Sequence, residues 1–135
     1  MREEKLLKIL KDNFGHSEFR FDQKEIINSV LNGKDTLAIM PTGGGKSICY
    51  QVPAIFCDGI TLVISPLISL MYDQVLNLAQ NGIEACFLNS SLDAGMRRDT
   101  EEGILAGKYK MVYVSPEGLL SGGLSRFFKQ VKVLN

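Results

Sequence analysis

A stretch near the first third of the chain runs Asp35-Thr36-Leu37-Ala38-Ile39-Met40 and continues Pro41-Thr42-Gly43-Gly44-Gly45-Lys46-Ser47. Its first half is almost wholly apolar, which is typical of a strand covered on both faces of a parallel sheet. Its second half is rich in glycine and leads into a helical pattern over residues 46–56. We therefore expect a strand, a loop and a helix in this order.

Similar apolar runs recur downstream, over residues 60–64, 84–88 and 110–114. Helical patterns over residues 67–80 and 93–106 alternate with these runs. The four runs start at positions 35, 60, 84 and 110, and each step has the length of a strand, a crossover helix and two loops. This repetition predicts an α/β fold, with an open, mainly parallel sheet and helices on both faces.

The N-terminal residues predict two helices before the first apolar run. The first covers residues 2–13, and the second opens at Asp22, with Glu25 as its capping-box partner, and ends at Gly33. Pro53 is expected to bend or interrupt the helix over residues 46–56.

Composition sets wide limits on function. With 135 residues, 45% of them hydrophobic, the chain has the makeup of one soluble domain or a piece of one. Its 15 Lys and Arg balance its 15 Asp and Glu, so composition alone gives no nucleic-acid signature. No apolar run approaches the ~20 residues that cross a bilayer, and the cysteines form no metal-type pair. We expect a cytoplasmic protein with reduced thiols at Cys49, Cys57 and Cys86.

The loop at residues 42–47 matches most of the phosphate-loop pattern G-x-x-x-x-G-K-[ST], with Met40 at the leading glycine position. Consecutive glycines let backbone N–H groups converge on phosphate oxygens, and the helix that follows adds its positive end. Lys46, the candidate catalytic residue, would supply charge to the terminal phosphates of ATP, and the Ser47 hydroxyl would bind Mg²⁺. An ordinary glycine-rich turn is the structural alternative.

Residues 42–53 resemble the phosphate loop of superfamily 2 helicases, most closely those of the RecQ family. Further segments agree in order and spacing, namely residues 14–23, 65–74, 88–91 and 114–117. This resemblance covers residues 6–120. It implies a RecA-like first motor domain over residues 1–135, with N-terminal helices and an adenine motif over residues 1–33 and P-loop βα units over residues 34–135. It also implies ATP-dependent unwinding of DNA in the 3′ to 5′ direction, in repair and recombination.

The resemblance assigns an adenine-binding role to three residues of the N-terminal segment. Gln23 would read the adenine edge, Arg20 would help to hold the nucleotide, and His16 stands where many relatives have a stacking aromatic ring. From the residues alone, His16 reads as a surface histidine and Gln23 as a solvated residue in the first turn of a helix.

The resemblance also places single-stranded or partly duplex DNA against the loops that follow the later strands. Hydroxyls there could donate to backbone phosphates without reading the base sequence. The alternative for each serine is a turn or a helix cap. The candidate DNA-binding residues are Ser65, Pro66, Leu67, Asn89, Ser90, Ser91, Ser115, Pro116 and Glu117.

Three departures from the family pattern bear on activity. Phe21-Asp22 stands where relatives commonly have Pro and a small or polar residue, and Gly118 replaces an Arg that often follows Ser-Pro-Glu. No Asp-Glu-Ala-His or similar motif occurs, although this class needs an acid for Mg²⁺ and water. We therefore expect a partial motor domain that ends before the acidic strand, with weak nucleotide binding and little hydrolysis.

Three other functions share the phosphate loop. An RNA helicase or another superfamily 2 translocase fits it, but the segment at residues 16–23 is more similar to RecQ. A non-hydrolysing nucleotide-binding module fits the missing acidic motif. A small-molecule kinase would not be expected to carry the later helicase-like segments.

Overall fold

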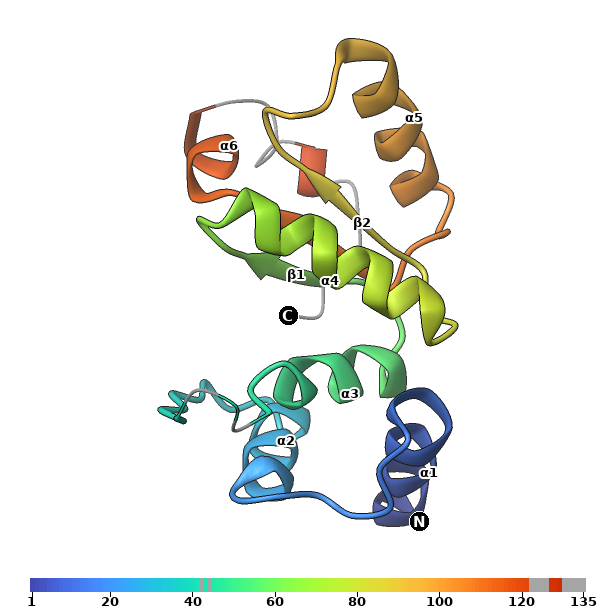
Figure 1. Cartoon of the computed structure of the whole chain (residues 1–135), viewed down its shortest axis with the longest axis vertical. Helices are drawn as coiled ribbons and strands as arrows, with labels where there is room; N and C mark the ends of the chain where they lie inside the picture. The colour runs from blue at the N-terminus through green and yellow to red at the C-terminus, as the bar shows by residue number, and fades with distance from the viewer. Residues whose placement is uncertain (42, 44, 122–126, 130–135) are drawn as a thin grey trace. The chain divides into compact units, whose positions relative to one another are not determined.

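The computed structural model describes residues 1–41, 43, 45–121 and 127–129. Its elements belong to two units, which we call the N-terminal unit (Met1–Cys57) and the C-terminal unit (Asp58–Asn135). Figure 1 shows the helices and strands of both units.

Three helices build the described part of the N-terminal unit: α1 (Arg2–Phe14), α2 (Gln23–Leu31) and α3 (Ile48–Phe56). Each places apolar residues at helical spacing toward a shared core, which therefore forms without a strand. The predicted interruption at Pro53 does not occur, because α3 continues through this residue to Phe56. The buried core residues are Leu6, Leu10, Ile27, Ile48 and Val52.

The C-terminal unit contains a parallel sheet of three strands, β1 (Thr61–Ile64), β2 (Ala85–Leu88) and β3 (Met111–Val114). Their order in the sheet is β1-β3-β2, so β3 is central, and all four of its residues are buried. The helices α4 (Ile68–Gln80) and α5 (Ala94–Leu105) connect the strands, and α6 (Pro116–Ser121) follows β3. The prediction of an open parallel sheet is confirmed, and these three strands lie within one residue of their predicted bounds.

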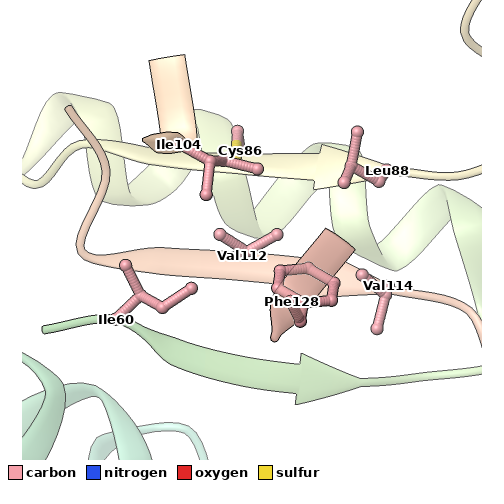
Figure 2. Close-up of a cluster of buried hydrophobic side chains, with 7 residues drawn as sticks. All are labelled: Ile60, Cys86, Leu88, Ile104, Val112, Val114 and Phe128. Carbon is pink, nitrogen blue, oxygen red and sulfur yellow. The ribbon is translucent and has the colours of Figure 1, made fainter. Parts of the chain in front are cut away.

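Helices cover both faces of this sheet, as predicted. Neighbouring residues of a strand point to opposite faces, so Val112 and Tyr113 mark the two sides of β3. On the Val112 side, Ile104 of α5 completes a buried apolar cluster (Figure 2). On the Tyr113 side, the phenol donates a hydrogen bond to Gln74 of α4 at 2.7 Å. The cluster consists of Ile60, Cys86, Leu88, Ile104, Val112, Val114 and Phe128.

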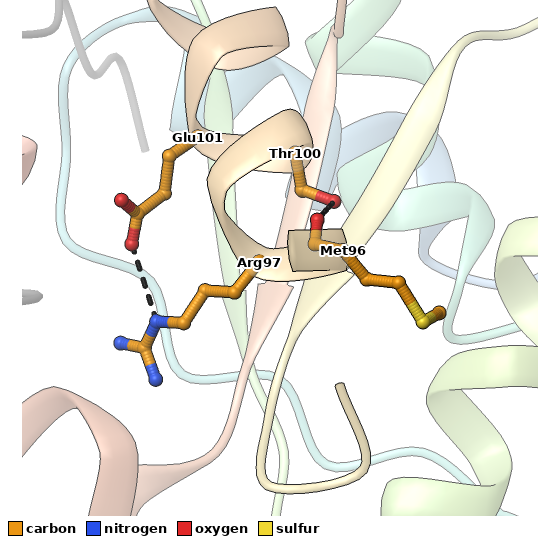
Figure 3. Close-up of polar contacts among 4 residues, drawn as sticks. All are labelled: Met96, Arg97, Thr100 and Glu101. Carbon is orange, nitrogen blue, oxygen red and sulfur yellow. Dashed lines mark hydrogen bonds and ion pairs between the residues drawn. The ribbon is translucent and has the colours of Figure 1, made fainter. Parts of the chain in front are cut away.

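Local side-chain bonds stabilise α5. Asp93 precedes the helix with an extended backbone, and its carboxylate accepts a hydrogen bond from the Met96 N–H at 2.8 Å. One turn further along, Arg97 pairs with Glu101 at 3.2 Å and the Thr100 hydroxyl donates to the Met96 carbonyl (Figure 3). Each contact spans about one helical turn, so together they add local support to the helix, which Ile104 also anchors in the core.

The predicted strand over residues 35–40 is wrong. The segment has no regular secondary structure, and the Leu37 and Ile39 side chains are each 89% exposed. A strand needs a neighbour to pair its backbone N–H and C=O groups. The described residues of the N-terminal unit include no other strand, so the apolar run stays unpaired despite its strong β propensity.

The predicted capping box at α2 is also wrong. Asp22 precedes the helix, but its side chain makes no cap hydrogen bond. Its backbone lies at φ −91° and ψ 13°, whereas a capping side chain needs the extended backbone that Asp93 has. The turn that sets this conformation includes Phe21, whose φ is 49°.

Candidate functional site

Two glycines of the glycine-rich loop have a backbone conformation that other residues rarely adopt. Gly43 and Gly45 have φ values of 80° and 75°, in the left-handed region that favours glycine. Ser47 follows as the N-cap of α3, and the Lys46 side chain is exposed. Two predicted site residues, Thr42 and Gly44, lie outside the described residues.

Gln23 joins the predicted adenine motif to this loop. Its side chain is buried, and its Nε2 donates to the Gly45 carbonyl at 3.1 Å. Its Oε1 accepts from the Arg20 N–H at 2.8 Å. The simple alternative of a solvated first-turn residue is therefore wrong for Gln23, because both ends of its amide are engaged in the N-terminal unit.

The other two adenine-motif residues lie on the surface. Arg20 is exposed, and its guanidinium lies over the Phe21 ring, 5.1 Å from the ring centroid. His16 is exposed just beyond the end of α1, where its N–H donates to the Leu10 carbonyl at 3.4 Å. The contacts thus join Gln23 to the loop and the Arg20 backbone to Gln23, whereas the N–H of His16 bonds a carbonyl of α1.

Gly45 leaves no room for a side chain. A Cβ there would collide with Nε2 of Gln23, whereas a Cβ at Gly43 would meet nothing within 4 Å. We expect Gly45→Ala to weaken ATP binding about 10-fold and Gly43→Ala to weaken it less, since both strain the backbone but only the first displaces Gln23. Titration with a fluorescent ATP analogue measures both, with Gly107→Ala in the other unit as the control. Equal losses at Gly43 and Gly45 would contradict the role of the Gln23 contact.

Burial raises the pKa of one thiol beside the loop, that of Cys49. Cys49 in the first turn of α3 is buried, and its Sγ lies 3.9 Å from the Gly45 carbonyl oxygen and 3.8 Å from Sδ of Met40. Loss of hydration raises the pKa of this thiol above its usual range. Cys49 is therefore a neutral packing group beneath the loop at ordinary pH, and it adds no negative charge where an anion would bind.

A second group of predicted residues gathers at one edge of the C-terminal sheet. Ser65, Asn89 and Ser115 each directly follow a strand. Ile64 and Leu88 both align with Val114 in the parallel register, so the three strands end together. The Ser65 N–H donates to the Val114 carbonyl at 3.0 Å. We call these strand-following loops the carboxyl edge, which is where ligands bind in open α/β sheets.

Hydrogen bonds fix the shape of each loop at the carboxyl edge. Ser65 Oγ accepts from the Leu67 N–H at 3.2 Å, and Ser115 Oγ accepts from the Gly118 N–H at 3.1 Å. Asn89 Oδ1 accepts from the Ser91 N–H at 2.8 Å and from the Ser91 hydroxyl. The turn and cap roles considered for these serines are therefore real.

Exposure divides the predicted DNA-binding residues into two kinds. Asn89 and Ser115 are buried, so they shape the loops, and Ser65 and Pro116 are half-buried. The remaining members are exposed, and they are Pro66, Leu67, Ser90, Ser91 and Glu117. The sequence did not reveal this division, because burial of Asn89 depends on Met71 of α4, whose Sδ accepts from the Asn89 amide at 3.4 Å.

The described residues contain no group of three His, Cys, Asp or Glu side chains that could hold a metal ion. Mg²⁺ that arrives with a nucleotide keeps several waters and binds through one or two protein oxygens and the nucleotide phosphates. The half-buried Ser47 can contribute such an oxygen. Within the part of the chain that the structure describes, no helix is long and apolar enough to cross a membrane.

Comparison with known proteins gives a consistent picture. Residues 20–134 match the family model described as DEAD/DEAH box helicase. The chain is 50% identical over 127 residues to ATP-dependent DNA helicase RecQ of Haemophilus influenzae, which covers 94% of this chain and 20% of that protein. RecQ of Bacillus subtilis is 44% identical over 126 residues, covering 93% of this chain and 21% of that protein.

One similar protein carries a different name. A protein of Acanthamoeba polyphaga mimivirus, whose name places it among ATP-dependent RNA helicases, is 49% identical over 121 residues, or 88% of this chain and 21% of that protein. The chain spans about a fifth of the length of these relatives. The comparisons confirm the resemblance to RecQ helicases that the motifs indicated.

Proposed function

Because the chain belongs to the DEAD/DEAH box helicase family, we propose that it supplies the ATP-binding loop and part of the DNA-binding surface of a RecQ-type DNA helicase. The proposed parent activity is unwinding of DNA in the 3′ to 5′ direction, driven by ATP hydrolysis, in repair and recombination. Relatives named ATP-dependent DNA helicase RecQ support this proposal over most of the chain's length. We also propose a cytoplasmic location, in contact with the chromosome if the source is bacterial.

The observation that carries the proposal is the hydrogen bond from Gln23 to the Gly45 carbonyl. A nucleotide has a base at one end and phosphates at the other, so its site must join two kinds of recognition. Gln23 and Arg20 would contact adenine, and the glycine loop would bind the phosphates. The bond at 3.1 Å makes these two parts neighbours in one unit. His16 remains a proposed member of the base site.

The loop residues have distinct proposed roles. The N–H groups of residues 42–45 would donate to phosphate oxygens, aided by the positive end of α3. Lys46 is exposed and free to extend toward the terminal phosphates, where its charge would offset the negative charge of the transferring group. Mg²⁺, when bound through Ser47, would neutralise phosphate charge and help to orient the phosphates.

At the carboxyl edge, we propose contacts to the backbone of single-stranded or partly duplex DNA. The exposed Ser90 hydroxyl could donate to a phosphate, and the Ser91 hydroxyl could do so after it releases Asn89 Oδ1. Pro66, Leu67, Pro116 and Glu117 would shape the path of the DNA strand. Ser65, Asn89 and Ser115 would hold the loops. None of these contacts reads a base edge, so binding would not depend on sequence.

Binding assays on the chain test this function directly. A fluorescent ATP analogue with Mg²⁺ should bind, and unlabelled ATP should displace it. In a separate titration, labelled single-stranded DNA should bind more tightly than single-stranded RNA of the same sequence, with an affinity that falls as salt rises. No ATP binding would refute the nucleotide site, and stronger binding to RNA would favour the RNA helicase alternative.

Phosphate release under the same conditions tests the expected lack of turnover. This class hydrolyses ATP with an acid that holds the metal and an arginine from a second domain. The 135 residues contain no Asp-Glu-Ala-His or similar motif that would supply this acid. Turnover at rates typical of an enzyme, about 1 s⁻¹ or faster, would contradict the expectation.

A further inference from the structure

Phe21 has a strained backbone conformation and an aromatic side chain that is exposed to water. Among the described residues it is the only non-glycine with a positive φ, at 49°. A bulky side chain is disfavoured there, because its Cβ crowds the backbone. The ring is also 67% exposed, so little apolar burial offsets the strain. Outliers of this kind are typical of functional sites.

The turn around Phe21 does not itself require an aromatic residue. The Gln23 N–H donates to the Arg20 carbonyl at 3.1 Å and closes a four-residue turn. The φ values of its two central residues, 49° and −91°, have the signs of a type II′ turn, in which glycine prevails at the first central position. Glycine at position 21 would form this turn without strain, so the turn does not explain why an aromatic residue occupies this position.

The groups around the Phe21 ring indicate a role in ligand binding. The Arg20 guanidinium lies over one face of the ring, 5.1 Å from its centroid, and Phe21 is still 67% exposed, so much of the ring stays open to a ligand. Gln23 completes the turn, and its amide accepts from the Arg20 N–H and donates to the Gly45 carbonyl of the phosphate loop. An exposed aromatic ring in the turn that Gln23 ties to the phosphate loop suits a nucleobase whose phosphates occupy that loop.

We propose that Phe21 is a base-stacking residue, which binds the nucleobase of a nucleoside triphosphate through the face of its ring. This inference rests on the proposed nucleotide site and adds a residue that the helicase resemblance does not supply, since the resemblance places the stacking ring at position 16, where this chain has His. Phe21 thereby makes the site prefer a nucleotide to a bare polyphosphate.

The test compares ATP with tripolyphosphate, which has the phosphates but no base. Competition with a fluorescent ATP analogue gives the affinity of each for the wild-type chain and for Phe21→Ala. Loss of the ring should weaken ATP binding about 10-fold, a typical effect of removing one stacked side chain, and leave tripolyphosphate within about 2-fold. Unchanged ATP affinity, or equal losses for both ligands, would refute the stacking role.

Phe21→Trp adds a spectroscopic signature, because the chain has no tryptophan. The variant should keep its ATP affinity, and its fluorescence should change with ATP and stay constant with tripolyphosphate. Tyr72→Trp, at an exposed aromatic position of α4, is the matched control and should respond to neither ligand. If Phe21→Trp bound ATP without a change in its tryptophan fluorescence, the result would contradict the proposal.

Phe21→Gly separates stacking from a structural role. Glycine relieves the positive φ, so the chain should become slightly harder to unfold while its ATP affinity falls. If Phe21 only supported the fold, Phe21→Gly would lower both the stability of the chain and its ATP affinity, and that result would overturn the inference. If the wild-type chain binds neither ligand, the proposed function fails with it. If the wild type binds ATP and the Phe21 variants match it, only the stacking role fails.

Discussion

Replacing Lys46 with alanine is expected to weaken ATP binding at least about 100-fold and to leave the free energy of unfolding within about 0.5 kcal/mol of wild type. The side chain is exposed, so its removal opens no cavity. A lysine 4 Å from a phosphate contributes about 4 kcal/mol at an effective dielectric of 20, and water around an open loop reduces this figure. Titration with a fluorescent ATP analogue and urea unfolding measure the two effects.

Lys34→Ala is the matched control for Lys46→Ala. Lys34 is also exposed and lies in the N-terminal unit, beyond the end of α2 and outside the glycine loop. Its loss removes the same charge from the same unit, so any general electrostatic effect appears in both variants. ATP affinities that fall equally in the two variants would show that Lys46 has no specific contact with phosphate.

The sequence predicts a strand of this fold correctly only where the segment has another strand to pair with. The runs at residues 60–64, 84–88 and 110–114 pair with one another, and the alternation of apolar runs with helical patterns predicted both them and the helices between them. The run at residues 35–40 has the same character, yet Leu37 and Ile39 are exposed. Apolar pattern reports the tendency of a segment to be buried, whereas strand formation also needs a partner that lies elsewhere in the chain.

Helix caps show the same dependence on context at shorter range. Asp22 and Asp93 are the same residue type before a helix, but only Asp93 bonds the helix N–H groups. The difference lies in the backbone, since the turn at Phe21 leaves Asp22 outside the extended region. The sequence marked Phe21-Asp22 as unusual, but it could not give the φ angle that disables the cap.

Residues of the candidate site that lie in one short motif could be predicted from the sequence, but contacts between residues far apart in the chain could not. Gly43, Gly45, Lys46 and Ser47 follow from a short pattern with a known chemical purpose. The bond between Gln23 and Gly45 joins residues that are 22 positions apart, so no short pattern predicts it. Likewise, the order β1-β3-β2 puts the loop after β3 between the other two, and chain order alone would not.

The largest effect on stability is expected at the centre of the C-terminal sheet. Tyr113 on β3 is only 2% exposed, and its phenol donates to Gln74 of α4 at 2.7 Å. Tyr113→Ala removes the ring from a packed face and should lower the free energy of unfolding by about 3–5 kcal/mol. Tyr113→Phe keeps the ring and removes the hydrogen bond, which should cost about 1 kcal/mol, because Gln74 is half-buried and can turn to water.

The gap between the two Tyr113 variants measures how much of the α4 contact is apolar packing. Urea unfolding monitored by circular dichroism gives both values. Tyr72→Ala is the control, since Tyr72 lies on the same helix and meets Phe87 edge-on at 6.2 Å but is 55% exposed, so its loss should cost about 1 kcal/mol or less. If Tyr113→Ala cost no more than Tyr72→Ala, α4 would not be held by this face of the sheet. The loop after β1, which α4 anchors at the carboxyl edge, would then lack the support that the DNA-binding proposal requires.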